Sequence, residues 1–386
     1  MTDHPPLRVA LIGTSRRSER FYGAILRHLP AVELVSVWGR TPDSAKRTGE
    51  LLGVPHYTDM AQLVRETTPQ IGIVSVAYAA NGEAGLMAVE SGLHVLLETP
   101  IAHKLREADA IIAAAEQRGL KIEVAEQFHR RPMEQLKLKL IASGLFGEVY
   151  SSFSDFAGHG YHGISIMRSY LGFERKPLSV TGLIGEYPLT AHWSRLGNHR
   201  NPRTEMQEHA LIQFEGGRIG IFHWTSVGYD SPLRWWRSGR FLAEKGMGIT
   251  TGIGLHEDEK LSLLAEGGEA PRFITIERRW ERTDGGVLEA MVAHTGDANL
   301  PIVKWENPFR STALGLPLGH GPQWHDDEIA VASCVMSLVD AVNHNTAPSY
   351  GALQGRLDQE LILAVRQSAA QDGALVQLPL GPNAGE

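Results

Sequence analysis

Short apolar segments alternate with helical patterns through the first third of the chain, and this alternation restricts the fold more than any other feature. Residues 7–12 form an apolar segment of strand length that ends at Gly13, and a helical pattern follows to Leu29. Further strand-like segments occur at 32–38, 71–76, 94–97 and 121–125. Parallel strands need crossover helices between them, so we predict an α/β fold in which residues 1–125 form a doubly wound parallel sheet.

A different pattern begins after residue 125 and predicts a second domain over residues 126–386. From Ser179 to Ile253, strand-like segments are separated by Gly-rich turns, which is typical of a large, mostly antiparallel sheet. Residues 257–321 are charged and rich in turns, and we expect them to be irregular. The other segments expected here are helices at 132–143, 163–171, 326–342 and up to about 370, and a strand at 147–156. We expect the terminal helices to pack back on the first domain.

Composition restricts the class of protein. A chain of 386 residues with 42% hydrophobic residues is long enough for two cores. The net charge of −7 and the lack of a basic tract argue against a nucleic-acid partner. A polar start and the lack of a membrane-length apolar segment predict a cytoplasmic protein with no membrane partner. The single cysteine, Cys334, is expected to be buried.

The turn after the first strand keeps part of a dinucleotide-binding motif. Such a turn needs a glycine where the strand bends and small residues where the backbone approaches a pyrophosphate. Gly13 occupies the first position, and Ser15 and Ser18 stand in the other two. Arg16 and Arg17 add positive charge beside the expected phosphates, although a solvated cationic loop would look the same. We therefore predict a dinucleotide here, contacted by Gly13, Ser15, Arg16 and Arg17.

The end of the second strand bears on the type of dinucleotide. An acid at this point binds the adenosine ribose and repels a 2′-phosphate. This chain has Gly39, Arg40 and Thr41 instead, which supply a guanidinium and a hydroxyl but no carboxylate. These residues favour NADP over NAD as the cofactor. The alternative is that Arg40 is only a surface cation.

Several motifs follow one another in an informative order. They are Gly13, Ala31–Val35, Ser91–Pro100, Phe128–Arg131, Ser143–Val149, His162 with Arg168, Leu171–Gly172 and the tail from Asp340 to Tyr350. Together they resemble the glucose–fructose oxidoreductase and inositol dehydrogenase (Gfo/Idh/MocA) family over nearly the whole chain. The resemblance implies a Rossmann domain, then an α/β domain with a large open sheet. It also implies a homodimer or homotetramer formed through that sheet.

The chain departs from the family pattern at several positions. The family usually has Glu-Lys-Pro where this chain has Glu98, Thr99 and Pro100, and Tyr78 and Asn81 replace other customary residues. The resemblance places Tyr78, Asn81, Glu98 and Pro100 at the cofactor. A threonine hydroxyl does not titrate in the range that proton transfer needs. We therefore expect Thr99 to orient the substrate or the nicotinamide.

The resemblance also aligns His162 with the family's active-site histidine. Histidine titrates near neutrality, so His162 is the expected proton donor or acceptor, with Tyr161 or His159 in support. Asp155, His159 and His162 offer mixed nitrogen and oxygen ligands, but their spacing is loose and we expect no metal.

Aromatic and polar side chains in the second half suit a sugar or a cyclitol, whose C–H faces stack on rings while its hydroxyls need polar partners. The expected substrate contacts are Gln127, His129, Arg130, Asp155, Arg168, His209 and Trp236. Trp193, Glu208, Trp224 and Arg237 belong to the same group of segments. Each tryptophan has an alternative role in filling a sheet interface or an oligomer contact.

These features predict a nicotinamide-dependent oxidoreductase that acts on a sugar, a cyclitol or a related keto or polyol compound. The missing lysine keeps a second class open, namely a glycosidase or lyase with a bound nicotinamide that oxidises, eliminates and reduces again. A third class is a non-catalytic ligand-binding relative.

Overall fold

The computed structural model describes residues 4–156, 159–194, 197–228, 237–253, 258–264, 270–281, 287–310 and 325–381. Its first sheet has six parallel strands in the order β3-β2-β1-β4-β5-β6. The strands are β1 (Leu7–Ile12), β2 (Val32–Trp38), β3 (His56–Tyr57), β4 (Ile71–Val74), β5 (His94–Leu97) and β6 (Ile122–Val124). The doubly wound sheet predicted from the alternation is therefore confirmed.

The helices of this part connect successive strands. They are η1 (Ser18–Tyr22), α1 (Gly23–His28), α2 (Pro42–Leu52), α3 (Met60–Thr67), η2 (Tyr78–Ala80), α4 (Asn81–Glu90) and α5 (Leu105–Arg118). Local chemistry sets their ends: the Thr41 hydroxyl accepts from the Ser44 amide at the start of α2, and Gly53 ends that helix with φ +73°. The short β3 and α3 were not expected from the sequence.

The strand order creates a crevice at the carboxyl ends of β1 and β4. The chain leaves β1 toward β2 on one side and returns to β4 on the other, so the connections diverge between these two strands. Doubly wound sheets bind ligands at such a point.

The second sheet has eleven strands in the order β18-β17-β16-β15-β14-β13-β7-β12-β11-β8-β19. All its pairs are antiparallel except β7 with β12. Its strands are β7 (Val149–Phe156), β8 (Pro177–Leu189), β11 (Arg203–Phe214), β12 (Arg218–Thr225), β13 (Arg237–Ala243), β14 (Gly246–Thr251), β15 (Asp258–Leu264), β16 (Pro271–Trp280), β17 (Leu288–His294), β18 (Ile302–Glu306) and β19 (Val376–Gln377). A separate small sheet pairs β9 (His192–Trp193) with β10 (His199–Arg200).

The expectation that residues 257–321 are irregular is wrong, because β15 to β18 lie within this range. In β16, Ile274 is buried while its neighbours Phe273 and Thr275 are exposed, and arginines and glutamates occupy much of the rest of the strand. Side chains alternate between the two faces of a strand, so charges on one face are compatible with a sheet. The density of charge concealed this alternation in the sequence.

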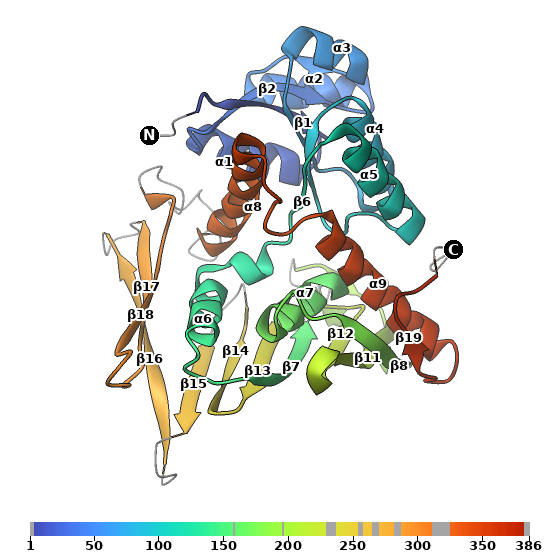
Figure 1. The fold of residues 1–386 in the computed structure, drawn as a ribbon. Coiled ribbons are helices and arrows are strands. Elements are labelled where there is room, and N and C mark those ends of the chain that lie inside the picture. Colours follow the sequence, from blue (N-terminus) through green and yellow to red (C-terminus); the bar gives the residue numbers. More distant parts are fainter. Residues whose placement is uncertain are drawn as a thin grey trace.

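Four helices lie between the two sheets, as Figure 1 shows. They are α6 (Pro132–Ala142), α7 (Gly160–Leu171), α8 (His325–His344) and α9 (Ala352–Ala369). Helix α7 packs on β7, β12 and β13, and α9 contacts both β8 and α5. Helix α8 contacts β5 and β6, so the terminal helices do pack back on the first sheet.

Among the described helices, none combines the length and apolar content that a membrane crossing needs.

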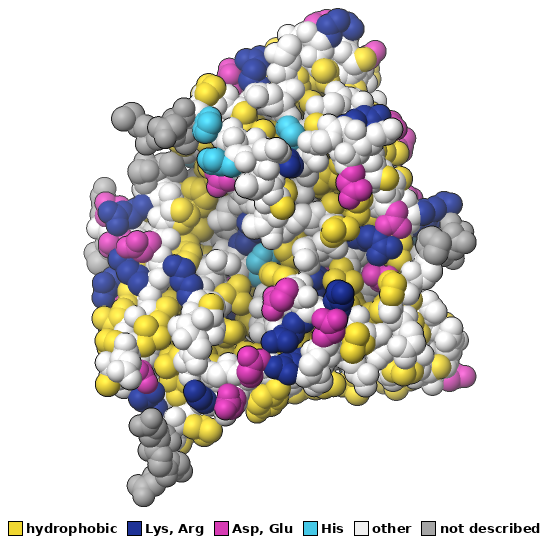
Figure 2. Space-filling model, in the orientation of Figure 1, with side chains coloured by type: hydrophobic (Ala, Val, Ile, Leu, Met, Phe, Trp, Pro, Cys, Tyr) yellow, Lys and Arg dark blue, Asp and Glu magenta, His cyan; other side chains and the backbone are white. Residues whose placement is uncertain are grey.

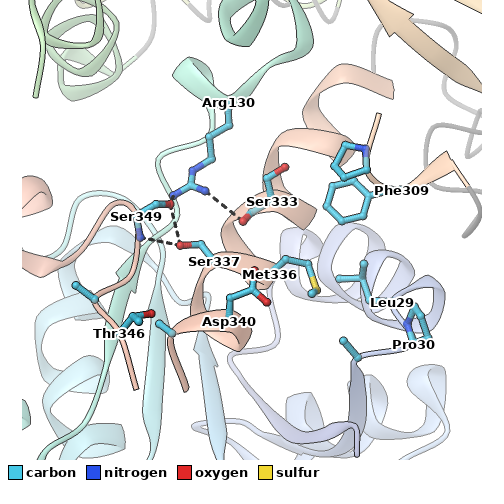
Figure 3. Close-up of a pocket in the computed structure, with 14 residues that line it drawn as sticks. Leu29, Pro30, Arg130, Phe309, Ser333, Met336, Ser337, Asp340, Thr346 and Ser349 are labelled. Atoms are coloured by element: carbon cyan, nitrogen blue, oxygen red, sulfur yellow. Dashed lines mark hydrogen bonds between the residues drawn. The ribbon is translucent and has the colours of Figure 1, made fainter. Parts of the chain in front are cut away.

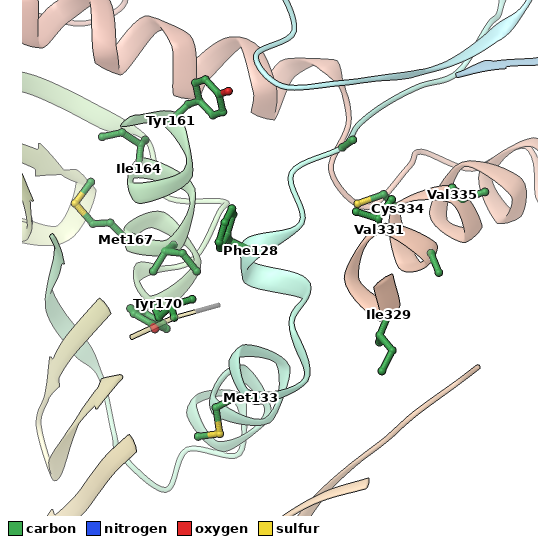
Figure 4. Packing of buried hydrophobic residues seen from close by; sticks show 14 of the residues in the cluster. Phe128, Met133, Tyr161, Ile164, Met167, Tyr170, Ile329, Val331, Cys334 and Val335 are labelled. Atoms are coloured by element: carbon green, nitrogen blue, oxygen red, sulfur yellow. The ribbon is translucent and has the colours of Figure 1, made fainter. Parts of the chain in front are cut away.

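Apolar side chains fill the space between these helices. Figure 4 shows Phe128 between α7 and α8, with Tyr161, Ile164 and Met167 on the α7 side. Cys334 lies in α8 on the opposite side, is fully buried as expected, and has its pKa raised to about 12 by burial. Both signs of charge are interspersed on the surface in view in Figure 2.

A buried ion pair joins α7 to α9. Arg168 is completely buried, and its Nη1 donates to Asp358 Oδ1 at 2.5 Å. Its Nη2 donates to the side chain of Gln354, while the Tyr350 hydroxyl donates to the other oxygen of Asp358. The prediction that Arg168 contacts substrate is therefore wrong, since interior partners occupy its guanidinium.

We predict that Arg168→Met lowers the free energy of unfolding by roughly 3–5 kcal/mol, because it leaves the Asp358 carboxylate buried without its counter-ion. Arg310→Met is the matched control, since Arg310 pairs with Glu289 at 3.0 Å with its side chain 48% exposed. Such a half-exposed pair contributes about 0–1 kcal/mol. Urea unfolding of the two variants checks this, and equal shifts would contradict the importance of the buried pair.

Candidate active site

The turn after β1 leaves no room for a side chain at Gly13. This glycine has φ +124°, and a Cβ built there would lie 2.2 Å from the Ser75 carbonyl oxygen. The Ser15 hydroxyl accepts from the Ser18 amide at 3.1 Å, and the Ser18 hydroxyl donates to the Ser75 carbonyl at 3.0 Å. The two serines therefore hold the turn against the end of β4, where the motif usually has glycines.

A cavity of about 450 Å³ opens beside this turn. It is lined by Gly13, Thr14, Ser15, Trp38, Arg40, Val76, Ala77, Ala80, Glu83, Ala84 and Met87. Arg40 is exposed at the end of β2, while Gly39 is buried where a Cβ would meet Thr14 at 2.8 Å. The indole of Trp38 and the backbone at Gly13 suit an adenosine and a pyrophosphate. The donor set of this cavity therefore fits a dinucleotide.

Sequence reasoning missed Glu83, which lines the same cavity from the first turn of α4. Its place after β4, beside the crevice of the sheet, was the available signal. Thr41, expected at the cofactor, instead uses its hydroxyl to cap α2.

Arg17 does not stay beside the phosphate turn as expected. Its Nε donates to Glu98 at the end of β5, and the Tyr22 hydroxyl donates to the same carboxylate oxygen at 2.7 Å. Arg16 remains exposed. Arg17 therefore brings a positive charge to the end of β5, next to the position where the family has its lysine.

Asn81 stabilises the same strand end. Its Nδ2 donates to the carbonyl oxygens of Glu98, at 2.5 Å, and Pro100, at 2.6 Å. Asn81 is 2% exposed, so it is a buried residue that fixes the backbone of the Glu98–Pro100 turn. Its predicted contact with the cofactor is replaced by this indirect role.

The most informative contact of the site joins His162 to Glu126. His162 lies in the first turn of α7, Glu126 follows β6, and their Nδ1 and Oε2 atoms are 2.6 Å apart. Both side chains are buried, and the Phe128 amide donates to the other oxygen of Glu126 at 3.1 Å. Burial raises the pKa of Glu126 to about 8 and lowers that of His162, the nearby Arg237 guanidinium lowering it further.

The directions of these two shifts define how the pair titrates. Burial disfavours the charged forms of both side chains. Below about pH 8 the pair therefore keeps a proton on Glu126, which a glutamate in water would have lost at that pH. Above that pH, a Glu126 carboxylate accepts from His162 Nδ1–H and leaves the Nε2 lone pair as a base. Glu126 was missed from sequence, although it stands two residues beyond β6, at the carboxyl edge of the sheet.

The other predicted catalytic residues gather beside this pair. The Tyr161 hydroxyl donates to the Thr99 carbonyl at 3.2 Å, and the rings of Tyr161 and His162 are 4.6 Å apart. His159 stacks on Tyr161 with ring centres 5.2 Å apart, and burial lowers the pKa of His159 to about 4. The structure thus brings together residues that are far apart in the sequence. Thr99 follows β5 of the first sheet, whereas His159, Tyr161 and His162 follow β7 of the second sheet.

A cavity of about 240 Å³ adjoins this cluster. It is lined by Tyr78, His159, Gly160, Tyr161, Trp224, Gln359, Ile362 and Arg366. Tyr78, expected at the cofactor, is 39% exposed and lies on this wall. The cavity is the candidate substrate site.

Arg130, one of the predicted substrate contacts, lies elsewhere. Its guanidinium donates to Glu123, to the Ser333 carbonyl at 3.2 Å and to the Ser349 hydroxyl at 2.9 Å. Figure 3 shows it on the wall of a different cavity, of about 710 Å³, which includes Leu29 and Pro30 before β2. This cavity is at the amino end of β2, opposite the crevice.

Three further predicted contacts are also placed outside the cluster. The Asp155 carboxylate is 2.6 Å from His223 Nδ1, and His223 stacks on His209 at 4.6 Å. Phe222 faces α7 near Gly160, so the adjacent His223 and its partners lie on the opposite face of the sheet. His129 is buried beside Ser165, at 3.2 Å.

Two predicted substrate contacts remain to be described, Gln127 and Trp236. Gln127 is 8% exposed in the turn before η3 (Phe128–Arg130). Trp236 lies outside the described residues. Within the described ranges, no group of three or more histidine, cysteine or acidic side chains is arranged to hold a metal ion.

Comparison with known proteins identifies the class of protein that this chain resembles. Residues 7–126 match the family described as "Oxidoreductase family, NAD-binding Rossmann fold" (GFO_IDH_MocA). An uncharacterized oxidoreductase of Bacillus subtilis, YfiI, is 24% identical and covers 80% of this chain and 95% of its own. A D-glucoside 3-dehydrogenase of Escherichia coli is 27% identical over 38% of this chain and 42% of its own.

The fold also resembles that of solved structures. An NAD binding oxidoreductase from Klebsiella pneumoniae superposes with a TM-score of 0.73 and 17% identity, covering 98% of this chain and 100% of that one. With the family match over the first sheet, these findings place the chain among the nicotinamide-dependent oxidoreductases. The match of residues 7–126 to the Gfo/Idh/MocA family agrees with the resemblance that the motifs indicated.

We predict that Gly13→Ala abolishes measurable binding of NADH and NADPH, because the new Cβ would displace the turn from β4. Fluorescence titration of the reduced cofactors measures the effect. Gly53→Asn is the control, since Gly53 is also left-handed but has open space around it. Retained cofactor binding in Gly13→Ala would contradict the role of this turn.

Proposed function

We propose that this protein oxidises or reduces a sugar, a cyclitol or a related keto or polyol compound with a nicotinamide cofactor, and that His162 transfers the proton. The observation that carries the proposal is the His162–Glu126 contact, which places a titratable pair beside Thr99 at the carboxyl edge of the cofactor sheet. The Escherichia coli relative, a D-glucoside 3-dehydrogenase, supports a carbohydrate substrate.

The chain's own residues divide the work as follows. Hydride transfer to or from the substrate carbon is the chemistry that the nicotinamide supplies when bound. His162 takes the hydroxyl proton during oxidation and returns it during reduction, while Glu126 holds the imidazole in the tautomer with Nε2 free. Tyr161 holds the Thr99 backbone, and Arg17 with Tyr22 fixes the Glu98 carboxylate.

The replacement of lysine by Thr99 keeps a second function open. A glycosidase or lyase that oxidises its substrate transiently, eliminates and reduces again would need the same cofactor cavity and the same base. A non-catalytic ligand-binding protein is the remaining alternative. The absorbance of the reduced nicotinamide distinguishes the dehydrogenase from the glycosidase or lyase. A net change in this absorbance on adding a sugar supports the dehydrogenase, and turnover of the sugar without a net change supports the glycosidase or lyase.

We predict that His162→Asn lowers the rate roughly 10²–10⁴-fold with nearly unchanged cofactor affinity, since asparagine cannot carry a proton. In the wild type, oxidation should rise with pH through about 8, because the basic form of the pair appears there. Glu126→Gln cannot ionise and should remove this pH-dependent rise, whereas Glu126→Asp should retain it. A wild-type profile preserved in Glu126→Gln would exclude Glu126 from proton transfer.

We further propose that the protein prefers NADP. Arg40 lines the adenosine side of the cavity, no carboxylate ends β2, and the amino end of α2 follows at once. A guanidinium and a helix N-terminus both favour a 2′-phosphate. Glu83, exposed in the same cavity, opposes this preference.

Arg40→Ala should weaken NADPH binding by roughly 1.5–3 kcal/mol, the range for a hydrogen bond to a charged group, and leave NADH within about twofold. Glu83→Gln is the converse variant and should strengthen NADPH, because it removes a negative charge. Calorimetric titration of both cofactors measures the ratio. Equal loss of NADPH and NADH in Arg40→Ala would show that Arg40 does not bind the phosphate.

We also propose that residues 1–125 and 126–386 are the two domains, and that the open face of the large sheet joins subunits into a homodimer or homotetramer. Leu183 and Leu211 are 58% and 51% exposed on that face, on the neighbouring strands β8 and β11. Exposed apolar side chains grouped on one surface are typical of protein–protein contacts.

A further inference from the structure

The cavity of about 240 Å³ has a polar wall that the proposed chemistry does not use. Gln359, Ile362 and Arg366 of α9 form this wall, and Tyr161 and Trp224 line the cavity from α7 and β12. Drug-sized ligands need about 300–1,000 Å³, so this space restricts a ligand to roughly one sugar ring. Its aromatic residues suit the C–H face of such a ring.

Arg366 is held in one orientation by a buried carboxylate. Its Nε donates to Glu208 Oε1 at 2.9 Å, and Glu208 is completely buried in β11. Trp224 pairs with Glu208 across the β11–β12 ladder, so the ion pair lies directly beside the aromatic wall. A guanidinium fixed through Nε presents its two terminal nitrogens as a planar pair of donors.

Those terminal nitrogens have no hydrogen-bond acceptor among the described residues. The Arg366 side chain is 43% exposed and lines the cavity, so its Nη1 and Nη2 atoms are accessible to a ligand. Glu208 Oε2 is buried and also makes no hydrogen bond within the described part of the chain. The pair thus leaves the two terminal nitrogens of Arg366 available on the cavity wall.

The buried Glu208 carboxylate behind Arg366 opposes an anion, but its Oε1 accepts from Arg366 and it does not line the cavity. The described residues that line it include no carboxylate, and Gln359 donates its Nε2 to the His103 carbonyl at 3.0 Å. Besides Arg366, the titratable residues that line the cavity are Tyr78, His159 and Tyr161. Burial lowers the pKa of His159 and raises that of Tyr78, so both are neutral near pH 7.

We propose that Arg366 binds a carboxylate of the substrate, so that the substrate is a sugar acid rather than a neutral sugar. The carboxylate would accept from Nη1 and Nη2, and the sugar ring would lie between Tyr161 and Trp224. Tyr161 also contacts His162, with ring centres 4.6 Å apart, so the cavity adjoins the proposed base. The assignment of this substrate class rests on the proposed function, but binding at Arg366 does not require turnover.

The test compares two matched ligands, methyl β-D-glucuronide and methyl β-D-glucoside. They differ only at C6, which is a carboxylate in the first and a hydroxymethyl group in the second. Calorimetry on the enzyme saturated with NADH or NADPH measures their affinities directly. We expect the glucuronide to bind wild type more tightly, and Arg366→Gln to weaken it by roughly 10- to 100-fold, as for a lost charge-assisted hydrogen-bond pair. The glucoside should stay within about twofold. Arg310→Gln, remote from the cavity, should change neither affinity.

A second variant tests the orienting role of Glu208. Glu208→Gln keeps the size of the side chain but loses the charge that holds Arg366, so the glucuronide should weaken less than in Arg366→Gln. Circular dichroism and thermal unfolding verify that each variant folds. If Glu208→Gln does not fold, the Arg366→Gln comparison decides the question alone.

The outcomes separate this inference from the proposed function. Arg366-dependent binding of the glucuronide without any oxidation supports the anion site and counts against the dehydrogenase. Oxidation of neutral sugars, with equal affinity for the two ligands or equal loss of both in Arg366→Gln, supports the dehydrogenase and overturns the anion site. Failure of the glucuronide, D-gluconate and D-galacturonate to bind below about 10 mM also overturns it.

Discussion

The site depends on how α7 is held against the carboxyl edge of the first sheet. His162 belongs to α7, which packs on the large sheet, whereas Glu126 follows the last strand of the first sheet. A contact of 2.6 Å between them requires that the two sheets keep a fixed position. Near the other end of α7, the buried Arg168–Asp358 pair ties this helix to α9, which also contacts α5. A buried pair constrains geometry strongly because breaking it leaves a charge without a partner.

Burial also compensates for the missing lysine. A lysine would bring one mobile charge to the strand end, whereas this chain has Thr99 there and places Arg17 against Glu98. Arginine stays protonated at any pH of interest, so Arg17 shapes the local field but takes no proton. In the proposed mechanism, proton transfer falls to His162 and Glu126, whose pKa values burial moves in opposite directions. Under this proposal, the positive charge near the end of β5 and the base are on separate residues, Arg17 and His162.

Local patterns were reliable where one physical cause dominates. The apolar strands of the first sheet, Gly13 after β1 and the buried Cys334 all follow from burial or from backbone sterics, which act over a few residues. Strands β15 to β18 were missed because charges on the exposed face hid the alternation. Arg168 and Arg130 were taken for ligand contacts because a sequence does not distinguish an arginine with a buried carboxylate partner from one facing a cavity.

The sequence by itself determined the doubly wound sheet, the tight turn at Gly13 and the resemblance of the first domain to its family, because strand periodicity and glycine positions are local properties. It also pointed to His162, Tyr161, His159 and Thr99, which the structure brings together. Tertiary structure alone decided their partners. Glu126 stands 36 residues before His162, and Glu208 stands 158 before Arg366. The packing of helices between the two sheets decides which carboxylate contacts which base or cation. Short-range sequence patterns do not indicate contacts between residues so far apart in the chain.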